Sequence, residues 1–547
     1  MAILPSDQPT ENLRATRSVV FARNGLIATS QPLASAAGLQ VLMAGGNAVD
    51  AAVTAAATLS VVEPTMTGIG GDLFALLHEG RTGAIHALNA SGRAPRAASL
   101  EAVLEVGGMP SFGIQSVSVP GAVDGWHQLL DRHGTISLGR ALAPAIEYAR
   151  NGFAVTEVVA SQWQTTADLL ALDPAAANTF LPNGRAPRAG EVFANQHLAE
   201  TLQQLAREGR DAFYEGSIAK AIVADARRRD GWLDEADLAA HRSDWVEPIR
   251  TTFRGYEVLE LPPNTQGITA LEVLNLLEPD DLGSLQHNSA AYLHRLIEAI
   301  RIAFADRDAY IADPAAVSPE LIEHLVSKEY AVTRHDEIDP DRAAPAYAPW
   351  GASVAGDTPG ASRSGKGDTV YLAAADRQGN VISLIQSLFG AFGAGIVAGD
   401  TGIVLQNRAS LFSTDPTHPN CLAPGKRPFH TLVPAMVLRA DVPWLSFGVM
   451  GGDMQTQAHV QVLLNMLLFG MDVQAAGEAA RARWTGDGVA LETGIPEEAH
   501  RGLRARGHRL VEMTGGFGGY QGIQVDAARG VLMGGSDPRK DGLAMGY

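Results

Sequence analysis

The chain has 547 residues, of which 46% are hydrophobic and 19% charged, and its formal net charge at pH 7 is −18. A chain of this composition can bury a sizeable core, and a strongly acidic chain without a basic stripe is a poor partner for nucleic acid or an anionic membrane surface. The single cysteine, Cys421, excludes an intramolecular disulfide and argues against a cysteine-based zinc site. No segment has the apolar length of a signal peptide or a membrane span, so we expect a cytoplasmic protein.

The first half of the chain predicts helices and strands separated by glycine turns. Residues 32–61 predict two alanine-rich helices, broken at Gly45-Gly46, with Asn47 as the cap of the second. The following EPTMTGIGGDLFALLHEG is a glycine turn that leads into a strand. Later, LELPPNTQGITALEVLNLLE predicts a turn and a helix, and YLHRLIEAIRIAFADRDAYIADP follows the helical period of about 3.6 residues.

A sharp boundary follows at Thr369. Residues 335–368 are rich in Pro, Gly, Ala and Ser, which is the composition of a linker. The apolar runs Val370–Ala375 and Val381–Ile385 come next, and the DRQGN between them predicts a hairpin turn. Beyond further strands and turns, AHVQVLLNMLLFGM predicts a helix. The first ordered residue after the linker is therefore a threonine.

The linker also contains an incomplete phosphate-binding motif. In GASRSGKG, Gly360, Gly365 and Lys366 have the spacing of G-x-x-x-x-G-K-[ST], but Gly367 replaces the hydroxyl residue that binds magnesium. A phosphate loop follows a strand and opens a helix, whereas this segment follows a linker and opens a strand. Nucleotide binding through Gly360–Gly367 stays a weaker alternative to a solvated loop.

Thr369 becomes a plausible nucleophile only if the chain is cut before it. Cleavage would give this residue a free α-amine with a pKa of about 7.7–8.0, which is a suitable general base near neutral pH. The amine and the hydroxyl would then form a reactive pair on one residue. Position alone does not decide the matter, because a threonine at the start of a strand also fits ordinary β-propensity.

Several ordered motifs resemble the γ-glutamyltranspeptidase (glutathione hydrolase) family of N-terminal-nucleophile hydrolases. They are GGNAVDAAVTAAATLSVVEPTMTGIGGDLFAL, SVPGAVDGW, PPNTQGIT, GDTVYLAAADRQGN, GAGIVAGDTGIVLQNR, PGKRPFHTLVPAMV, GVMGGDMQ and SDPRKDGLAMGY. The resemblance implies an α+β fold, a four-layer αββα sandwich, and a precursor that cuts itself between Asp368 and Thr369. The products would be a large subunit, Met1–Asp368, and a small subunit, Thr369–Tyr547, held together as an obligate heterodimer. It implies neither a metal nor an organic cofactor.

The resemblance also assigns roles around the nucleophile. Ser387, in IQSLF, falls where the family has a hydroxyl residue near the amine of the nucleophile, although an ordinary strand serine fits as well. Gly451 and Gly452, in MGGD, match the glycines whose N–H groups form the oxyanion hole.

The residues that hold the glutamyl group in classical members are mostly replaced. Ser91 stands in the place of a substrate-binding arginine, and Arg93 lies two residues later. At the other substrate-binding positions this chain has Phe389, Arg408, Leu411, His430 and Thr431.

Without the family's aspartate, no residue is evident that would pair with a substrate ammonium, and an unpaired buried charge is costly. Arg93, Arg408 and His430 could make the acyl pocket positive, although surface ion pairs explain such residues equally well. The sequence therefore predicts an amidohydrolase or acyltransferase for a small carboxylate-bearing acyl group, such as a glutaryl, oxamate-like or γ-glutamyl amide. True γ-glutamyl transfer or glutathione hydrolysis, and a non-cleaving binding protein, are the alternatives.

Overall fold

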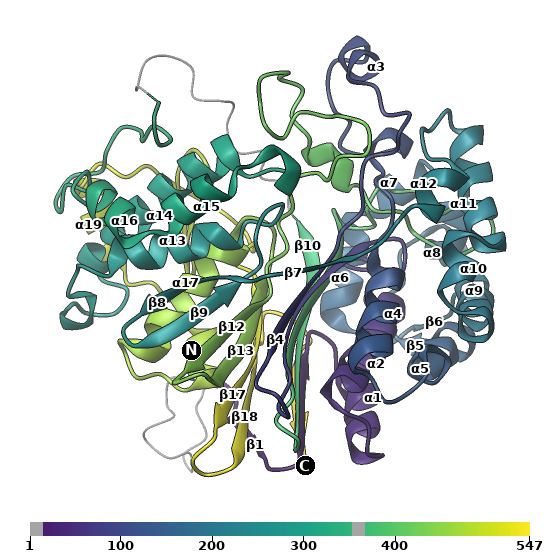
Figure 1. Ribbon diagram of the computed structural model, residues 1–547, viewed down its shortest axis with the longest axis horizontal. Coiled ribbons are helices and arrows are strands. Elements are labelled where there is room, and N and C mark those ends of the chain that lie inside the picture. The colour runs from purple at the N-terminus through teal and green to yellow at the C-terminus, as the bar shows by residue number, and fades with distance from the viewer. Residues whose placement is uncertain (1–14, 353–366) are drawn as a thin grey trace.

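Two seven-stranded sheets lie face to face, and a layer of helices covers the outer side of each sheet (Figure 1). The computed structural model describes residues 15–352 and 367–547. This arrangement confirms the predicted four-layer αββα sandwich. Within those two described ranges, no helix is both long and apolar enough to cross a membrane.

The sheet that carries Thr369 has the strand order β19-β2-β10-β11-β3-β4-β7, and all neighbouring strands are antiparallel. Its strands are β2 (Gly25–Thr29), β3 (Asp72–His78), β4 (Ile85–Ala90), β7 (Asp244–Val246), β10 (Asp368–Asp376), β11 (Val381–Phe389) and β19 (Leu543–Gly546). We call it the nucleophile sheet.

The second sheet has the order β1-β18-β17-β13-β12-β9-β8 and is also antiparallel throughout. Its strands are β1 (Val20–Ala22), β8 (Ile249–Phe253), β9 (Tyr256–Glu260), β12 (Ala435–Arg439), β13 (Val442–Met450), β17 (Gly519–Asp526) and β18 (Val531–Ser536). Two small sheets complete the strands: β5 (Phe153–Ala154) with β6 (Val192–Phe193), and β14 (Ala482–Trp484) with β15 (Val489–Leu491) and β16 (Leu510–Val511).

Each main sheet is covered by its own part of the chain. On the nucleophile sheet's side lie α1 (Pro32–Met43), α2 (Ala48–Val62), α3 (Leu100–Glu105), α4 (Ala122–His133), α5 (Leu138–Asn151), α6 (Glu157–Thr165), α7 (Ala167–Ala171), α8 (Pro174–Phe180), α9 (Gln196–Glu208), α10 (Arg210–Tyr214), α11 (Ser217–Arg228) and α12 (Glu235–Ala239). The other side has α13 (Gly267–Leu277), α14 (Ala290–Tyr310), α15 (Pro319–Val326), α16 (Lys328–His335), α17 (Met454–Leu467), α18 (Val473–Glu478) and α19 (Glu497–Ala505).

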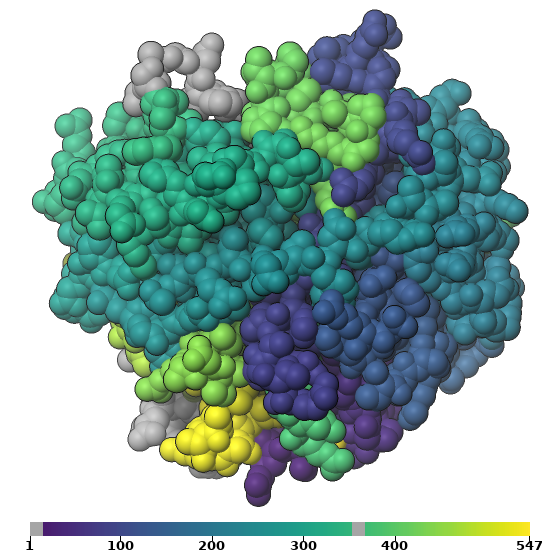
Figure 2. Space-filling view, in the orientation of Figure 1, coloured from purple at the N-terminus to yellow at the C-terminus, as the bar shows by residue number. Residues whose placement is uncertain are grey.

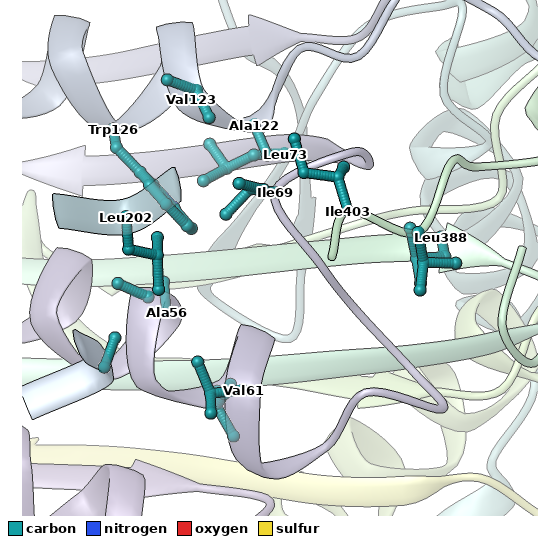
Figure 3. Close-up of a cluster of buried hydrophobic side chains, with 14 of the residues drawn as sticks. Ala56, Val61, Ile69, Leu73, Ala122, Val123, Trp126, Leu202, Leu388 and Ile403 are labelled. Carbon is teal, nitrogen blue, oxygen red and sulfur yellow. The ribbon is translucent and has the colours of Figure 1, made fainter. Parts of the chain in front are cut away.

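The side chains of β10 alternate between two cores. Tyr371, Ala373 and Ala375 belong to the core between the sheets, whereas Val370, Leu372 and Ala374 belong to the core under the helices. Figure 3 shows part of the latter core, which also receives Leu388 from β11. Because both faces are buried, β10 and β11 read as continuous apolar runs, and their register is firmly set.

The main predicted elements are confirmed. The alanine-rich segment forms α1 and α2, and Asn47 and Asp50 exchange hydrogen bonds as a capping box at the start of α2. The DRQGN segment joins β10 to β11 as a hairpin, with Gly379 at a φ of 83°. The later helical patterns correspond to α13, α14 and α17. Residues Gly360 to Lys366 of the incomplete phosphate motif lie outside the described residues.

Both sheets contain strands from before and after Thr369. In the nucleophile sheet, β10 and β11 lie between β2 and β3, and β19 pairs with β2. In the second sheet, β1 pairs with β18 and β9 pairs with β12. Figure 2 shows early (purple) and late (yellow) parts of the chain side by side at the lower edge. A cut before Thr369 would therefore leave two pieces that share both sheets.

Candidate active site

Thr369 lies at the start of β10 and is 1% exposed. Its hydroxyl donates a hydrogen bond to Ser387 Oγ at 3.4 Å, and the Ser387 hydroxyl donates to the carbonyl oxygen of Asp368 at 2.5 Å. The N–H of Phe389 also donates to Ser387 Oγ, at 2.7 Å, which holds the serine side chain in this position. A chain of two hydroxyl groups therefore ends on the carbonyl of the predicted cleavage site.

The end of β11 is fixed by the segment that precedes β3. Ser387 pairs with Asp72 across the two strands, and Leu388 N–H donates to the Met66 carbonyl at 3.1 Å. Gly71 packs so closely that a Cβ there would lie 2.3 Å from the Ser387 carbonyl oxygen. The glycine turn noted in the sequence thus permits a backbone contact that positions Ser387.

Gly451 and Gly452 lie between the end of β13 and the start of α17, with φ values of 121° and 58°. Neither N–H donates a hydrogen bond to another residue in the described parts of the chain. A Cβ on Gly367 would lie 2.9 Å from Gly452 Cα, so the chain just before the predicted cleavage site packs on this pair. Two free N–H groups beside a helix N-terminus suit a developing oxyanion.

A polar network that no sequence motif indicated lies behind the glycine pair. Gln266 Nε2 donates to the carbonyls of Thr431 and Gly452 at 2.9 and 3.1 Å. Arg307 donates to Gln266 Oε1 and to Asp453 Oδ1, both at 3.0 Å. Gln266 belongs to PPNTQGIT, which signalled the family resemblance but gave no role to this side chain. The network fixes the turn that presents Gly452.

Arg408 is a buried cation with unused donors. Its side chain is 0% exposed, its Nη1 donates to Thr431 Oγ1 at 3.0 Å, and its guanidinium stacks on the Phe389 ring at 4.5 Å. Nε and Nη2 have no hydrogen-bond partner among the described residues. Burial lowers the pKa of Arg408 to about 9, although the Asp72 carboxylate opposes this change. The predicted residues Phe389, Arg408 and Thr431 are therefore in contact with one another.

Asp72 and His430 form a buried pair beside Arg408. Asp72 accepts hydrogen bonds from Gly92 N–H and Gln406 Nε2, both at 3.0 Å, and from His430 Nε2 at 3.1 Å. Burial raises the pKa of Asp72 to about 6, with Arg408 opposing. Burial and the nearby arginines hold the pKa of His430 well below its usual range, so this ring adds no positive charge at neutral pH. Asp72 was not singled out in the sequence because its partners are distant along the chain.

Arg93 has a different environment from the other predicted binding residues. Its side chain is 46% exposed, and it forms ion pairs with Asp313 at 3.6 Å and Asp244 at 3.8 Å. Its charge is therefore compensated by two carboxylates near the surface. Of the three cationic side chains expected for the acyl pocket, Arg408 alone is both charged at neutral pH and without an ion-pair partner among the described residues within 4.0 Å.

A cavity of about 560 Å³ opens beside the nucleophile. Its lining includes residues on both sides of the predicted cleavage site, the end of β13, and the first turns of α6. The lining residues are Glu157, Val158, Ser161, Gln162, Gly367, Asp368, Thr369, Met450, Gly451, Arg483, Glu492, Thr514, Gly515, Gly516, Phe517, Gly518, Arg539 and Lys540. Thr369 is thus buried in the fold but borders a space large enough for a small substrate.

Within residues 15–352 and 367–547, two groups of histidine and glutamate side chains lie close enough together to hold a metal ion. His294 and His508 lie within hydrogen-bond distance, at 2.7 Å between Nδ1 and Nε2, which is too close for two ligands of one zinc ion. The other group consists of Glu79, His86 and His133. Glu79 follows the C-terminal end of β3, whereas Asp72 is the first residue of that strand.

An αββα sandwich with a threonine at the start of a central strand, beside a hydroxyl chain and a glycine turn, defines an N-terminal-nucleophile hydrolase. Comparison with known proteins gives the family: the profile of Gamma-glutamyltranspeptidase matches residues 34–547. The chain belongs to the γ-glutamyltranspeptidase family, which confirms the predicted resemblance. It is an enzyme of the amidohydrolase type.

Three similar proteins illustrate the range of this family. The glutathione hydrolase-like YwrD proenzyme of Bacillus subtilis is 39% identical over 538 residues, which cover 96% of this chain and 99% of the relative. The oxamate amidohydrolase proenzyme of Klebsiella pneumoniae is 36% identical and covers 96% and 98% of the two chains. The crystal structure of cephalosporin acylase from Bacillus halodurans is 41% identical, with a TM-score of 0.90 over 100% of this chain and 99% of the other.

Proposed function

We propose that this protein cuts itself between Asp368 and Thr369, and that the released threonine then hydrolyses amides of small acyl groups that carry a carboxylate. The hydrogen-bonded chain from the Thr369 hydroxyl through Ser387 to the Asp368 carbonyl is the observation that carries the first part. The relatives named as proenzymes support a precursor.

Self-cleavage would begin when Thr369 Oγ1 attacks the carbonyl carbon of Asp368. The hydrogen bond from Ser387 polarises this carbonyl and strengthens as negative charge develops on its oxygen. The C–N bond then breaks, the proton lost by the hydroxyl passes to the departing amine, and an ester joins Asp368 to Thr369 Oγ1. Water hydrolyses the ester, which yields the Asp368 carboxylate, the free hydroxyl and the free amine.

The mature reaction uses the same hydroxyl on an external amide. The neutral α-amine of Thr369 accepts the hydroxyl proton as Oγ1 attacks the substrate carbonyl, and then delivers it to the leaving amine. The N–H groups of Gly451 and Gly452 are available to the oxyanion. Water, or an acceptor amine, would release the acyl group from the ester.

The preference for a carboxylate-bearing acyl group rests on Arg408. This guanidinium is buried, charged at neutral pH, and has two donor groups without partners among the described residues. A carboxylate would satisfy both donors, and a buried unpaired cation is otherwise costly. Asp72, the buried carboxylate nearby, already accepts three hydrogen bonds, which leaves little capacity for a substrate ammonium. Arg408 and Asp72 together therefore favour a glutaryl or oxamate-like group over γ-glutamyl.

Hydrolysis or transfer of a true γ-glutamyl group is the second candidate. Family membership favours this candidate. The Asp72 carboxylate also favours it, because it lies close enough to Arg408 to influence the pKa of that arginine. Rates on glutaryl- and γ-glutamyl-p-nitroanilide, measured side by side, separate the two. We expect faster turnover of the glutaryl compound, and faster turnover of the γ-glutamyl compound would refute the preference.

Self-cleavage can be tested without a substrate. Denaturing electrophoresis and mass spectrometry of the purified protein should show two fragments, the smaller beginning at Thr369. Thr369→Ala should remain one full-length, inactive chain because no nucleophile is left, whereas Thr369→Ser should still process, more slowly. Active wild-type enzyme that consists of an unbroken chain would contradict the proposal.

A further inference from the structure

A side-chain cluster at the far end of β3 from the active site contains two imidazole rings and one carboxylate. Glu79 follows β3, His86 lies on β4, and His133 is the last residue of α4. One ligand atom from each of these residues lies within 4.8 Å of those of the other two. All three side chains are partly buried, so the cluster is open to a small ion from solvent. Two nitrogens and one oxygen are a donor set of transition-metal sites.

Both imidazole rings have an unused nitrogen. The Nε2 atoms of His86 and His133 are buried and have no hydrogen-bond partner within the described ranges. The contact between Glu79 Oε2 and His86 Nε2 is 3.7 Å, which is too long for a hydrogen bond. Burial and the neighbouring His86 ring lower the pKa of His133 to about 4, so the His133 ring is neutral near pH 7 and keeps a lone pair. An ordinary histidine–glutamate ion pair therefore does not account for the cluster.

The surrounding contacts hold the three side chains in place. Trp245, on β7, packs edge to face with both rings, at centroid distances of 6.2 and 5.4 Å. The Thr82 hydroxyl donates to Glu79 Oε2 at 2.8 Å. Asn47 Nδ2 donates to the His133 carbonyl at 2.7 Å, which joins the end of α4 to the cap of α2. Outer contacts of this kind orient the ligands of a metal ion.

Two arginines lie near the cluster, and solvent screens both of them. Arg81 donates to Glu79 Oε1 at 3.2 Å, and its side chain is 85% exposed. Arg132 stacks on the Trp245 ring at 4.6 Å and is also exposed. Screening weakens the repulsion between these charges and a bound cation. Glu79 Oε2, the oxygen nearer the histidines in the contact above, is not bound by Arg81.

We propose that Glu79, His86 and His133 bind one transition-metal ion of the Zn²⁺ type, which joins the β3–β4 hairpin to the end of α4. Imidazole with carboxylate suits Zn²⁺, whereas Mg²⁺ and Ca²⁺ prefer oxygen ligands alone. Glu79 is seven residues beyond Asp72, which pairs with Ser387, so the ion would lie roughly 20 Å along the sheet from that serine. This structural site therefore does not rest on the proposed amide hydrolysis.

Zinc binding to untagged, chelator-treated protein tests the site directly. Calorimetric titration of the wild-type protein with Zn²⁺ should show one binding site, and Mg²⁺ under the same conditions should show none. Glu79→Gln and His133→Gln should each weaken Zn²⁺ binding by about tenfold or more, because a lost ligand costs at least as much as a lost outer contact. His197→Gln removes an exposed histidine on α9 and should bind zinc as the wild type does.

Thermal unfolding gives a second readout, because an ion that binds only the folded protein stabilises it. Saturating Zn²⁺ should raise the unfolding midpoint of the wild type and of His197→Gln, and the increase should be lost in His133→Gln. If His133→Gln fails to fold, Glu79→Gln decides, because its side chain is 23% exposed and tolerates an isosteric change. Absence of zinc binding by the wild type, or binding equally tight in Glu79→Gln, would overturn the proposal. Neither measurement needs turnover, so both are valid whether or not the protein cleaves itself.

Discussion

Replacing Ser387 with alanine should stop the protein from maturing at a normal rate while its fold stays intact. The Ser387 hydroxyl is the donor to the Asp368 carbonyl, at 2.5 Å, and this oxygen would carry the negative charge of the cleavage transition state. Losing one such donor typically lowers a rate by about 10²–10³, or about 2.7–4 kcal/mol of transition-state stabilisation. The half-time of precursor cleavage should therefore lengthen by about the same 10²–10³-fold.

The assay is a time course of precursor and fragments on denaturing gels after synthesis in a cell-free system. Ser383→Ala is a matched control, because Ser383 is also buried on β11 but forms its hydrogen bond with the Tyr371 hydroxyl, at 2.7 Å. It should process at the normal rate. If Ser387→Ala matured as fast as wild type, or if Ser383→Ala were slowed equally, the role assigned to Ser387 would be refuted.

Two further predictions concern ionisation. In the proposed mechanism the cationic form of Arg408 binds the acyl carboxylate, and burial lowers the pKa of this arginine to about 9. The kcat/KM for glutaryl-p-nitroanilide should then fall about tenfold per pH unit well above pH 9, and the neutral butyryl analogue should lack this dependence. Equal profiles for the two substrates would argue against carboxylate binding by Arg408. Burial raises the pKa of Glu63 from 4.5 to about 7, and a hydrogen bond from Ser30 opposes this change. The side chain therefore lowers the free energy of unfolding progressively as the pH rises from 4.5 to 7, and the loss is complete above pH 7. Glu63→Gln should therefore be more stable than wild type at pH 8 by about 3 kcal/mol and indistinguishable at pH 4, measured by denaturant unfolding of the Thr369→Ala precursor; a difference independent of pH would contradict the assignment.

Local patterns predicted the elements well because each depends on neighbouring residues. Asn47 and Asp50 form the cap of α2 from positions three residues apart, and the hairpin turn before Asn380 contains its glycine at the position with positive φ. The boundary at Thr369 could be located for the same reason, since β10 begins at Asp368. The fold class followed from the ordered family motifs.

The electrostatics of the site could not be predicted because they depend on contacts between distant residues. His430 was expected to add positive charge, yet its burial keeps the ring neutral beside Asp72, 358 residues earlier in the chain. For Arg93 the sequence left both an acyl-pocket role and a surface ion pair open, and the structure pairs it with Asp244 and Asp313. No spacing rule in the sequence indicates these partners, and none indicates that Arg483 would lie beside the nucleophile.

The pairing of early with late strands in both sheets has a consequence for how the mature enzyme could refold. Once the bond before Thr369 is broken, unfolding releases two separate polypeptides, so recovery of the native state becomes a second-order process that slows on dilution. An uncut Thr369→Ala chain would refold at a rate independent of its concentration. Cleavage would thus convert a unimolecular folding reaction into a bimolecular association of two fragments. Folding would be most efficient before the chain is cut.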